Sequence, residues 1–160
     1  MAHGRLLGRT GRTDEAAERF ATAVTRFSEI GDVRLSLAAK SDLGHALRRG
    51  GRLEEAEAVY HETIGGWVRL GHRGAVANQL ENVAYIAVDR NDPERAARLF
   101  GAAEAMREVA ESPMAFDEAP EYAEFVERLR PVLEPAEFAN AWQAGRSMTM
   151  AEALAFATGA

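Results

Sequence analysis

The stretch GRLEEAEAVY, residues 51–60, decides the fold because its pattern occurs three times at one spacing. It aligns without gaps with GRTDEAAERF at 11–20 and, more loosely, with NDPERAARLF at 91–100. Each copy places an alanine four residues before an aromatic residue: Ala16 and Phe20, Ala56 and Tyr60, Ala96 and Phe100. A pattern that keeps one register over three copies indicates an internal repeat of forty residues.

Each repeat unit is predicted to be a pair of helices. In the second unit, apolar residues at helical spacing predict one helix over 33–49 and another over 53–70. Gly50 and Gly51 separate the two, since glycine readily takes the positive φ that a helix C-terminus requires. In the third unit Asp92 is expected to cap a helix that begins at Pro93. The glycine-arginine pair at 51–52 is therefore a corner between helices.

The small and large residues of the unit resemble the tetratricopeptide repeat. The pattern is carried by Leu43, Gly44, Gly51, Ala56, Tyr60 and Thr63, and more weakly by Gly4, Leu7, Gly11, Ala16, Phe20, Ala23, Val83, Ala84, Ala96, Phe100 and Ala103. The period is forty residues where that family usually has thirty-four, so we expect extended helices. The resemblance implies an all-α fold of antiparallel helix pairs over residues 1–110. The first unit is expected to be incomplete, with a short helix before a corner at Gly11.

A helical tail follows the repeats. Two prolines and several acids predict a linker loop over residues 111–119, and residues 120–160 are expected to form shorter helices packed on the repeats. These helices are predicted to begin after Pro120, at Pro135 and at Thr149. Thr149 and Glu152 have the spacing of a capping box.

Residues 92–158 resemble the C-terminal end of large bacterial transcriptional regulators, the LuxR-type and antibiotic-regulator-type ATPases. The residues that carry this likeness are Leu99, Phe100, Gly101, Ala102, Ala103, Phe138, Ala141, Trp142, Gly145, Arg146, Met148, Thr149, Glu152 and Ala153. The resemblance implies a regulatory interaction module in the cytoplasm of a bacterium. The 160 residues carry neither the ATPase motif nor a DNA-binding motif, so those activities are not transferred to them.

Composition excludes several functions. There are 25 acidic and 19 basic residues, a net charge of −6, which argues against direct binding of nucleic acid. The apolar stretches are shorter than the ~20 residues that span a bilayer. Cysteine is absent, which excludes thiolate metal sites and suits a cytoplasmic protein.

Catalytic and cofactor motifs are not found. GRTGRT and GGRLEE lack the lysine and the spacing of a phosphate-binding loop. The histidines His3, His45, His61 and His72 have no metal-ligand spacing. We therefore expect no enzyme activity, no metal and no cofactor.

The predicted binding surface is the face that the first helices of successive units would share. It comprises Ser41, His45, Arg48, Arg49, Asn78, Glu81, Asn82 and Tyr85. Asparagine and arginine side chains can grip a peptide backbone or a carboxylate, so the expected partner is a protein or peptide, including the rest of a parent regulator. Three alternatives remain open: a solvated groove without a ligand, a small-molecule effector site, and self-association through the incomplete first unit.

Overall fold

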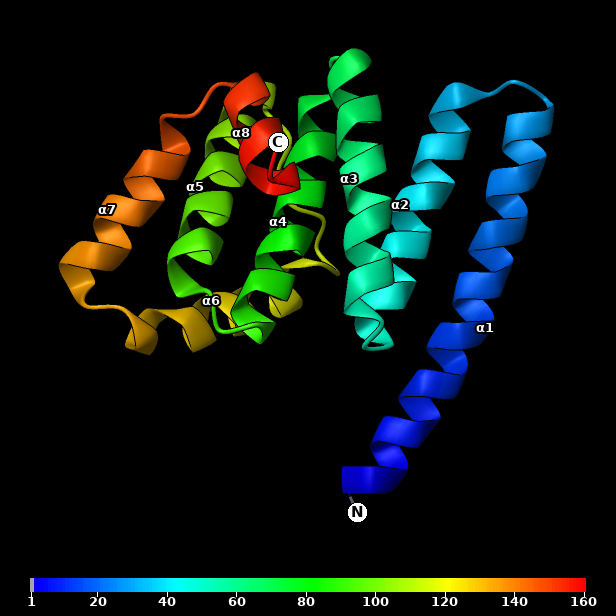
Figure 1. Cartoon of the computed structure of the whole chain (residues 1–160), viewed down its shortest axis with the longest axis horizontal. Helices are drawn as coiled ribbons and strands as arrows, with labels where there is room; N and C mark the ends of the chain where they lie inside the picture. The colour runs from blue at the N-terminus through cyan, green and yellow to red at the C-terminus, as the bar shows by residue number, and fades with distance from the viewer. Residues whose placement is uncertain (1) are drawn as a thin grey trace. The chain divides into compact units, whose positions relative to one another are not determined.

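A computed structural model describes the backbone of residues 2–160 and the side chains of residues 12–160. Within these residues the chain forms eight α-helices and one turn of 3-10 helix, with no strand (Figure 1). The prediction of an all-α fold built from helix-pair repeats is confirmed. The helices form two compact units, one ending at Gly66 and the other beginning at Trp67. The side chains of Gly4, Leu7 and Gly11, three of the weaker repeat positions, lie outside the described residues.

The forty-residue period has a backbone cause. A residue with positive φ recurs every twenty residues, at Gly31, Gly51, Gly71, Asn91 and Glu111. At each of these turns the residue after the left-handed one donates its N–H to a carbonyl five positions earlier, as Asp32 does to Phe27 and Arg52 does to Leu47. The same helix end is therefore built five times, and two such helices make one forty-residue unit.

The first compact unit contains α1 (Ala2–Glu29), α2 (Val33–Arg49) and the larger part of α3 (Leu53–Arg69). α1 packs along α2. α2 and α3 meet at Gly44, where a Cβ would lie 2.7 Å from the ring of Tyr60. Tyr60 is fully buried, so the small residue at 44 and the large one at 60 are complementary in shape.

One prediction about this unit is wrong. Gly11 was expected to form a corner after a short first helix, but α1 continues through it from Ala2 to Glu29. A glycine inside a helix costs only about 1 kcal/mol relative to alanine, so it does not end a helix by itself. Gly31 and Gly51 end theirs because a second helix folds back at each of these points.

The second unit is organised around α5 (Pro93–Ala110). α5 contacts α4 (Arg73–Asp89), α6 (Ala119–Leu129), α7 (Pro135–Arg146) and α8 (Met150–Thr158), and the 3-10 turn Arg130–Val132 joins α6 to α7. Asp92 caps α5 by accepting the N–H of Arg95, and the capping box predicted at Thr149 and Glu152 is present.

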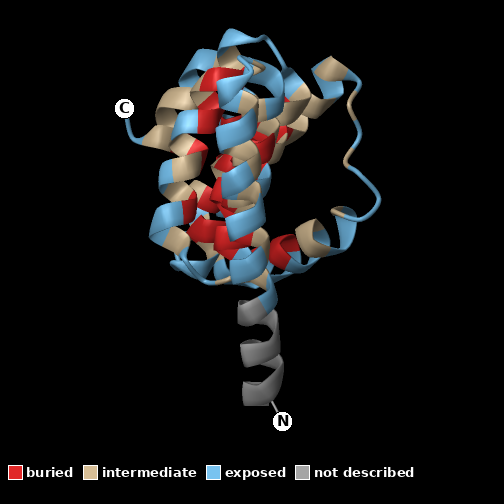
Figure 2. Cartoon of the chain, turned by 90° about the vertical axis from the view of Figure 1, so that its right-hand side faces the viewer, coloured by how far each residue is buried: buried red, intermediate tan, exposed pale blue. Residues whose placement is uncertain are grey.

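The core of the second unit is aromatic. The rings of Tyr85, Phe100, Tyr122, Phe125, Phe138 and Trp142 form one chain of contacts. Buried positions concentrate in α4 and α5, and Figure 2 shows the described residues coloured by burial. Nine consecutive residues of α4, 79–87, are buried, which is unusual for a helix that would line an open groove.

Candidate functional site: the polar face of α4

Four of the predicted groove residues lie on α2. Ser41 is buried and donates its hydroxyl to the carbonyl oxygen of Leu37. His45 is half-buried, with Nδ1 2.9 Å from the hydroxyl oxygen of Tyr60. Arg48 is buried, whereas Arg49 is exposed. Ser41 and His45 are therefore held by contacts inside the first unit.

The other four predicted residues lie on α4, within a stripe of residues along one side of that helix. Later residues of the second unit contact this stripe, and most of these contacts follow the order of the chain. Gly74 lies against Ser112, Asn78 bonds Glu118, Glu81 pairs with Arg107, Tyr85 stacks on Phe125 and Asp89 pairs with Arg128. Apart from Arg107, the covering residues run from 112 to 128 as the stripe runs from 74 to 89. The α4 part of the predicted groove is thus in contact with residues of its own chain.

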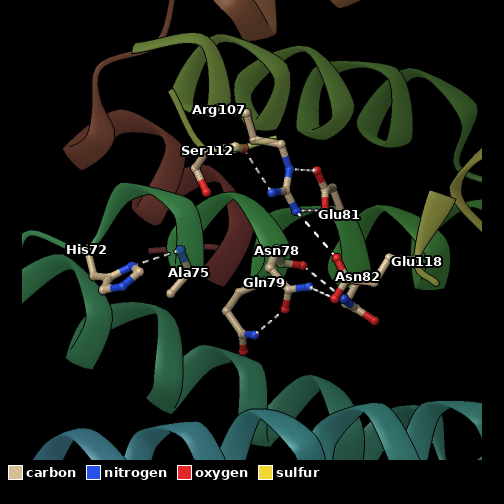
Figure 3. Close-up of polar contacts among 9 residues, drawn as sticks. All are labelled: His72, Ala75, Asn78, Gln79, Glu81, Asn82, Arg107, Ser112 and Glu118. Atoms are coloured by element: carbon tan, nitrogen blue, oxygen red, sulfur yellow. Dashed lines mark hydrogen bonds and ion pairs between the residues drawn. The ribbon is translucent and has the colours of Figure 1, made fainter. Parts of the chain in front are cut away.

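Glu81 and Arg107 form a buried ion pair at the centre of this face. Nε and Nη2 of Arg107 lie 2.6 and 2.7 Å from the two carboxylate oxygens of Glu81, which is only 2% exposed (Figure 3). Burial raises the pKa of Glu81 above its ordinary value, and the contact with Arg107 opposes that rise. Burial would lower the pKa of Arg107, but its contacts with Glu81 outweigh this and raise it. The pair is a fixed, mutually neutralising element.

Residues 111–118 join α5 to α6 and pass beside the ion pair of Glu81 and Arg107. We call this segment the strap. Nη1 of Arg107 donates to the carbonyl oxygen of Ser112 at 3.3 Å. Nδ2 of Asn78 donates to a carboxylate oxygen of Glu118 at 2.9 Å, and Arg107 lies 3.8 Å from the other (Figure 3). The strap is therefore attached near both of its ends to α4 and α5.

Asn82 and Gln79 complete the polar cluster beside the strap. Nδ2 of Asn82 donates to the backbone carbonyl of Asn78 at 2.9 Å, and Nε2 of Gln79 donates to Oδ1 of Asn78 at 3.0 Å (Figure 3). The bond from Gln79 orients the Asn78 amide so that its Nδ2 points at Glu118. The arrangement provides neutral and charge-assisted donors for a carboxylate.

Sequence reasoning did not find Arg107, Ser112 or Glu118. A signal was present, because Glu111, Ser112 and Pro113 occupy the register positions of Asn91, Asp92 and Pro93. The twenty-residue rule would start a helix at 113, yet α6 begins at Ala119. Pro120 accounts for this start, since proline lacks the N–H that a helix interior needs and is tolerated only in the first turn of a helix.

In the described part of the chain, no cluster of three or more histidine, aspartate or glutamate side chains able to hold a metal ion occurs. None of the described helices combines the length and the apolar character needed to cross a membrane. A cavity of about 480 Å³ lies between α5 and α7, lined by Glu94, Arg98, Leu133, Glu137, Asn140, Ala141 and Ala144.

A family model described as Tetratricopeptide repeat matches residues 1–66, which include the Gly44 and Tyr60 contact. Tetratricopeptide repeats generally mediate protein–protein interactions and typically act as non-catalytic scaffolds. The comparisons with curated proteins and with solved structures each found no match.

Proposed function

We propose that the chain is a non-catalytic protein-interaction module belonging to the C-terminal part of a bacterial transcriptional regulator in the cytoplasm. It binds a peptide or protein, or other domains of its own regulator. The observation that carries this proposal is the tetratricopeptide-like repeat of residues 1–66, continued by further helices of the same twenty-residue spacing. Stacked helices of this kind present long surfaces to partners.

The packing of α7 on α5 supports the regulator parentage. Gly101 and Gly145 are two of the residues that carry the resemblance to the transcriptional regulators, and they lie where the backbones of these helices touch. Trp142 donates its indole N–H to Glu104 at 2.7 Å, and Arg146 pairs with Glu104 and Glu108 at 2.6 and 2.7 Å. Gly101, Trp142, Gly145 and Arg146 therefore belong to one contact between two helices, which gives a physical reason for their occurring together in a family.

A selection of random peptides displayed on phage tests the proposal. We expect peptides that bind the purified chain with micromolar Kd in fluorescence anisotropy, and we expect the separately produced remaining domains of the parent regulator to bind in the same assay. Failure of both would overturn the interaction function. A parent gene without ATPase or DNA-binding regions would overturn the regulator parentage and leave the interaction function standing.

Effector sensing is the second candidate, and the cavity between α5 and α7 favours it. Arg98 on one side and Glu137 with Asn140 on the other provide both signs of charge for a small polar molecule. Thermal-shift screening of metabolites tests this function. A metabolite that raises the melting temperature of the chain, but not that of an Asn140→Trp variant, would support it, and a screen without such a metabolite would remove it.

A further inference from the structure

The strap sits where a partner would bind, and we propose that it covers a docking site for a short acidic peptide on α4 and α5. The inference rests on the proposed function, because it names the partner chemistry of one face of the interaction module. In the structure the occupant of the site is the chain itself. Glu118 provides the carboxylate and Ser112 the backbone carbonyl that the peptide would provide.

The contacts that hold the strap are ones that another peptide can reproduce. Asn78 donates to a carboxylate, and Arg107 donates to a main-chain carbonyl. Every peptide with an acidic residue carries both acceptors. Recognition at these two points therefore selects for an acid at a suitable distance from a free carbonyl and is largely indifferent to the remaining side chains.

Without the strap, hydrogen-bond donors and not excess positive charge would hold a ligand's carboxylate. Arg107 and Glu81 neutralise each other, and Asn78 adds donors without charge. Glu118 is then a second carboxylate beside a single arginine. A partner's carboxylate that replaces Glu118 meets the same donors, with no additional acid left in the site.

The strap is lightly attached compared with the surface beneath it. Five of its eight residues are exposed, and Phe116 is 94% exposed. Glu81 and Asn82 below it are buried. Segments that bury little apolar surface open at a low free-energy cost, so the strap can lift while α4 and α5 stay folded. As a tethered ligand it has an effective concentration of about millimolar, which a free partner must overcome.

The test uses the strap's own sequence as the free ligand, an eight-residue peptide ESPMAFDE with blocked ends. The hosts are the full chain, its Glu118→Ala variant, and a variant with residues 113–117 replaced by glycine and serine and with Glu118→Ala. The Glu118 side chain makes no capping bond to α6, so Glu118→Ala leaves the start of that helix intact. Asp117→Asn is the matched control, an exposed acid next to Glu118. Circular dichroism and thermal unfolding verify that each host is folded.

We expect the labelled peptide to bind both strap variants at least tenfold more tightly than it binds the unchanged chain or Asp117→Asn. A peptide ending in glutamine in place of glutamate should lose about tenfold, and so should a host in which Asn78→Ala is added. Hydrogen exchange should show faster exchange of residues 112–118 in Glu118→Ala, with α5 unchanged.

Equal binding to all folded hosts, or no binding to the strap variants, would overturn this inference. Selection of phage-displayed peptides on the chain with the replaced strap distinguishes a failure of this inference from a failure of the proposed function. Peptides that bind there independently of Asn78 keep the interaction function and exclude this docking site. No binding peptide at all would overturn both.

Discussion

Gly145 of α7 lies directly against the backbone of Arg98 in α5, where a Cβ would be 1.9 Å from the Arg98 carbonyl oxygen. The opposite contact is similar, since a Cβ on Gly101 would lie 2.0 Å from the carbonyl oxygen of Trp142. Both obstacles are backbone atoms, which cannot rotate away. At Gly101 and Gly145 the two helices therefore meet backbone against backbone, with no side chain between them.

Gly145→Ala is therefore expected to separate α5 from α7 and to lower the free energy of unfolding by about 3 kcal/mol, in the upper range for overpacking. Helix propensity alone would predict a gain of about 1 kcal/mol. The measurement is urea unfolding followed by tryptophan fluorescence, since Trp67 and Trp142 both lie in the second unit. Ala139→Gly on the exposed side of α7 is the control and should cost about 1 kcal/mol. A Gly145→Ala variant as stable as the original would contradict the close packing.

The left-handed turns predict two opposite effects. Gly51 has a φ of 82° and open space around it, so Gly51→Ala should destabilise by about 1 kcal/mol through backbone strain alone. Glu111 has a φ of 49° with a side chain present, so Glu111→Gly should stabilise by about 0.5 to 1 kcal/mol. Melting temperatures measured side by side test both. Changes of the same sign in the two variants would refute the role of the turn.

The repeat could be predicted from the sequence because its causes are local. Gly51, Asp92 and Pro93 act on their own turns, and the pair of Ala56 and Tyr60 recurs at a fixed distance from them. The fate of Gly11 could not be predicted in the same way. Whether a glycine ends a helix depends on whether another helix folds back there, and that is a property of packing.

The candidate site could be predicted only in part. The α4 residues of the predicted face do lie on one stripe, because helical spacing dictates it. What covers that stripe depends on where the chain goes after α5. Arg107 reaches Glu81 across 26 residues of sequence and Glu118 reaches Asn78 across 40, and no local pattern predicts such separations. Whether the groove residues bind a partner stays a prediction.

The ion pair of Glu81 and Arg107 predicts a pH-dependent defect. Arg107→Met should destabilise by about 3 to 5 kcal/mol at neutral pH, because it leaves a buried carboxylate without its counter-charge. Glu81 already has a raised pKa in the folded protein. A carboxyl with a raised folded pKa contributes most below its unfolded value, and the contribution is lost as pH rises through the folded pKa.

The difference in free energy of unfolding between Arg107→Met and the original chain should thus be smallest near pH 4 and grow toward pH 7. Denaturant unfolding at a series of pH values measures it. The double variant with Glu81→Leu should be more stable at pH 7 than Arg107→Met alone, since it removes the uncompensated charge. A defect that does not change with pH would mean that the lost packing of the arginine stem, and not the charge, is responsible.

The capping box of α8 predicts the opposite dependence on pH. Hydrogen bonds from the backbone and the side chain of Thr149 lower the pKa of Glu152 below its ordinary value of 4.5. A group with a lowered folded pKa stabilises the protein above its unfolded pKa, and that contribution is lost as pH falls through the folded value. Glu152→Gln should therefore lower the melting temperature at pH 7 and match the original chain once the pH is well below 4.5. Glu124→Gln, an exposed acid of α6, is the control and should track the original chain at every pH. If Glu152→Gln also tracks it at pH 7, the carboxylate contributes nothing to the start of α8.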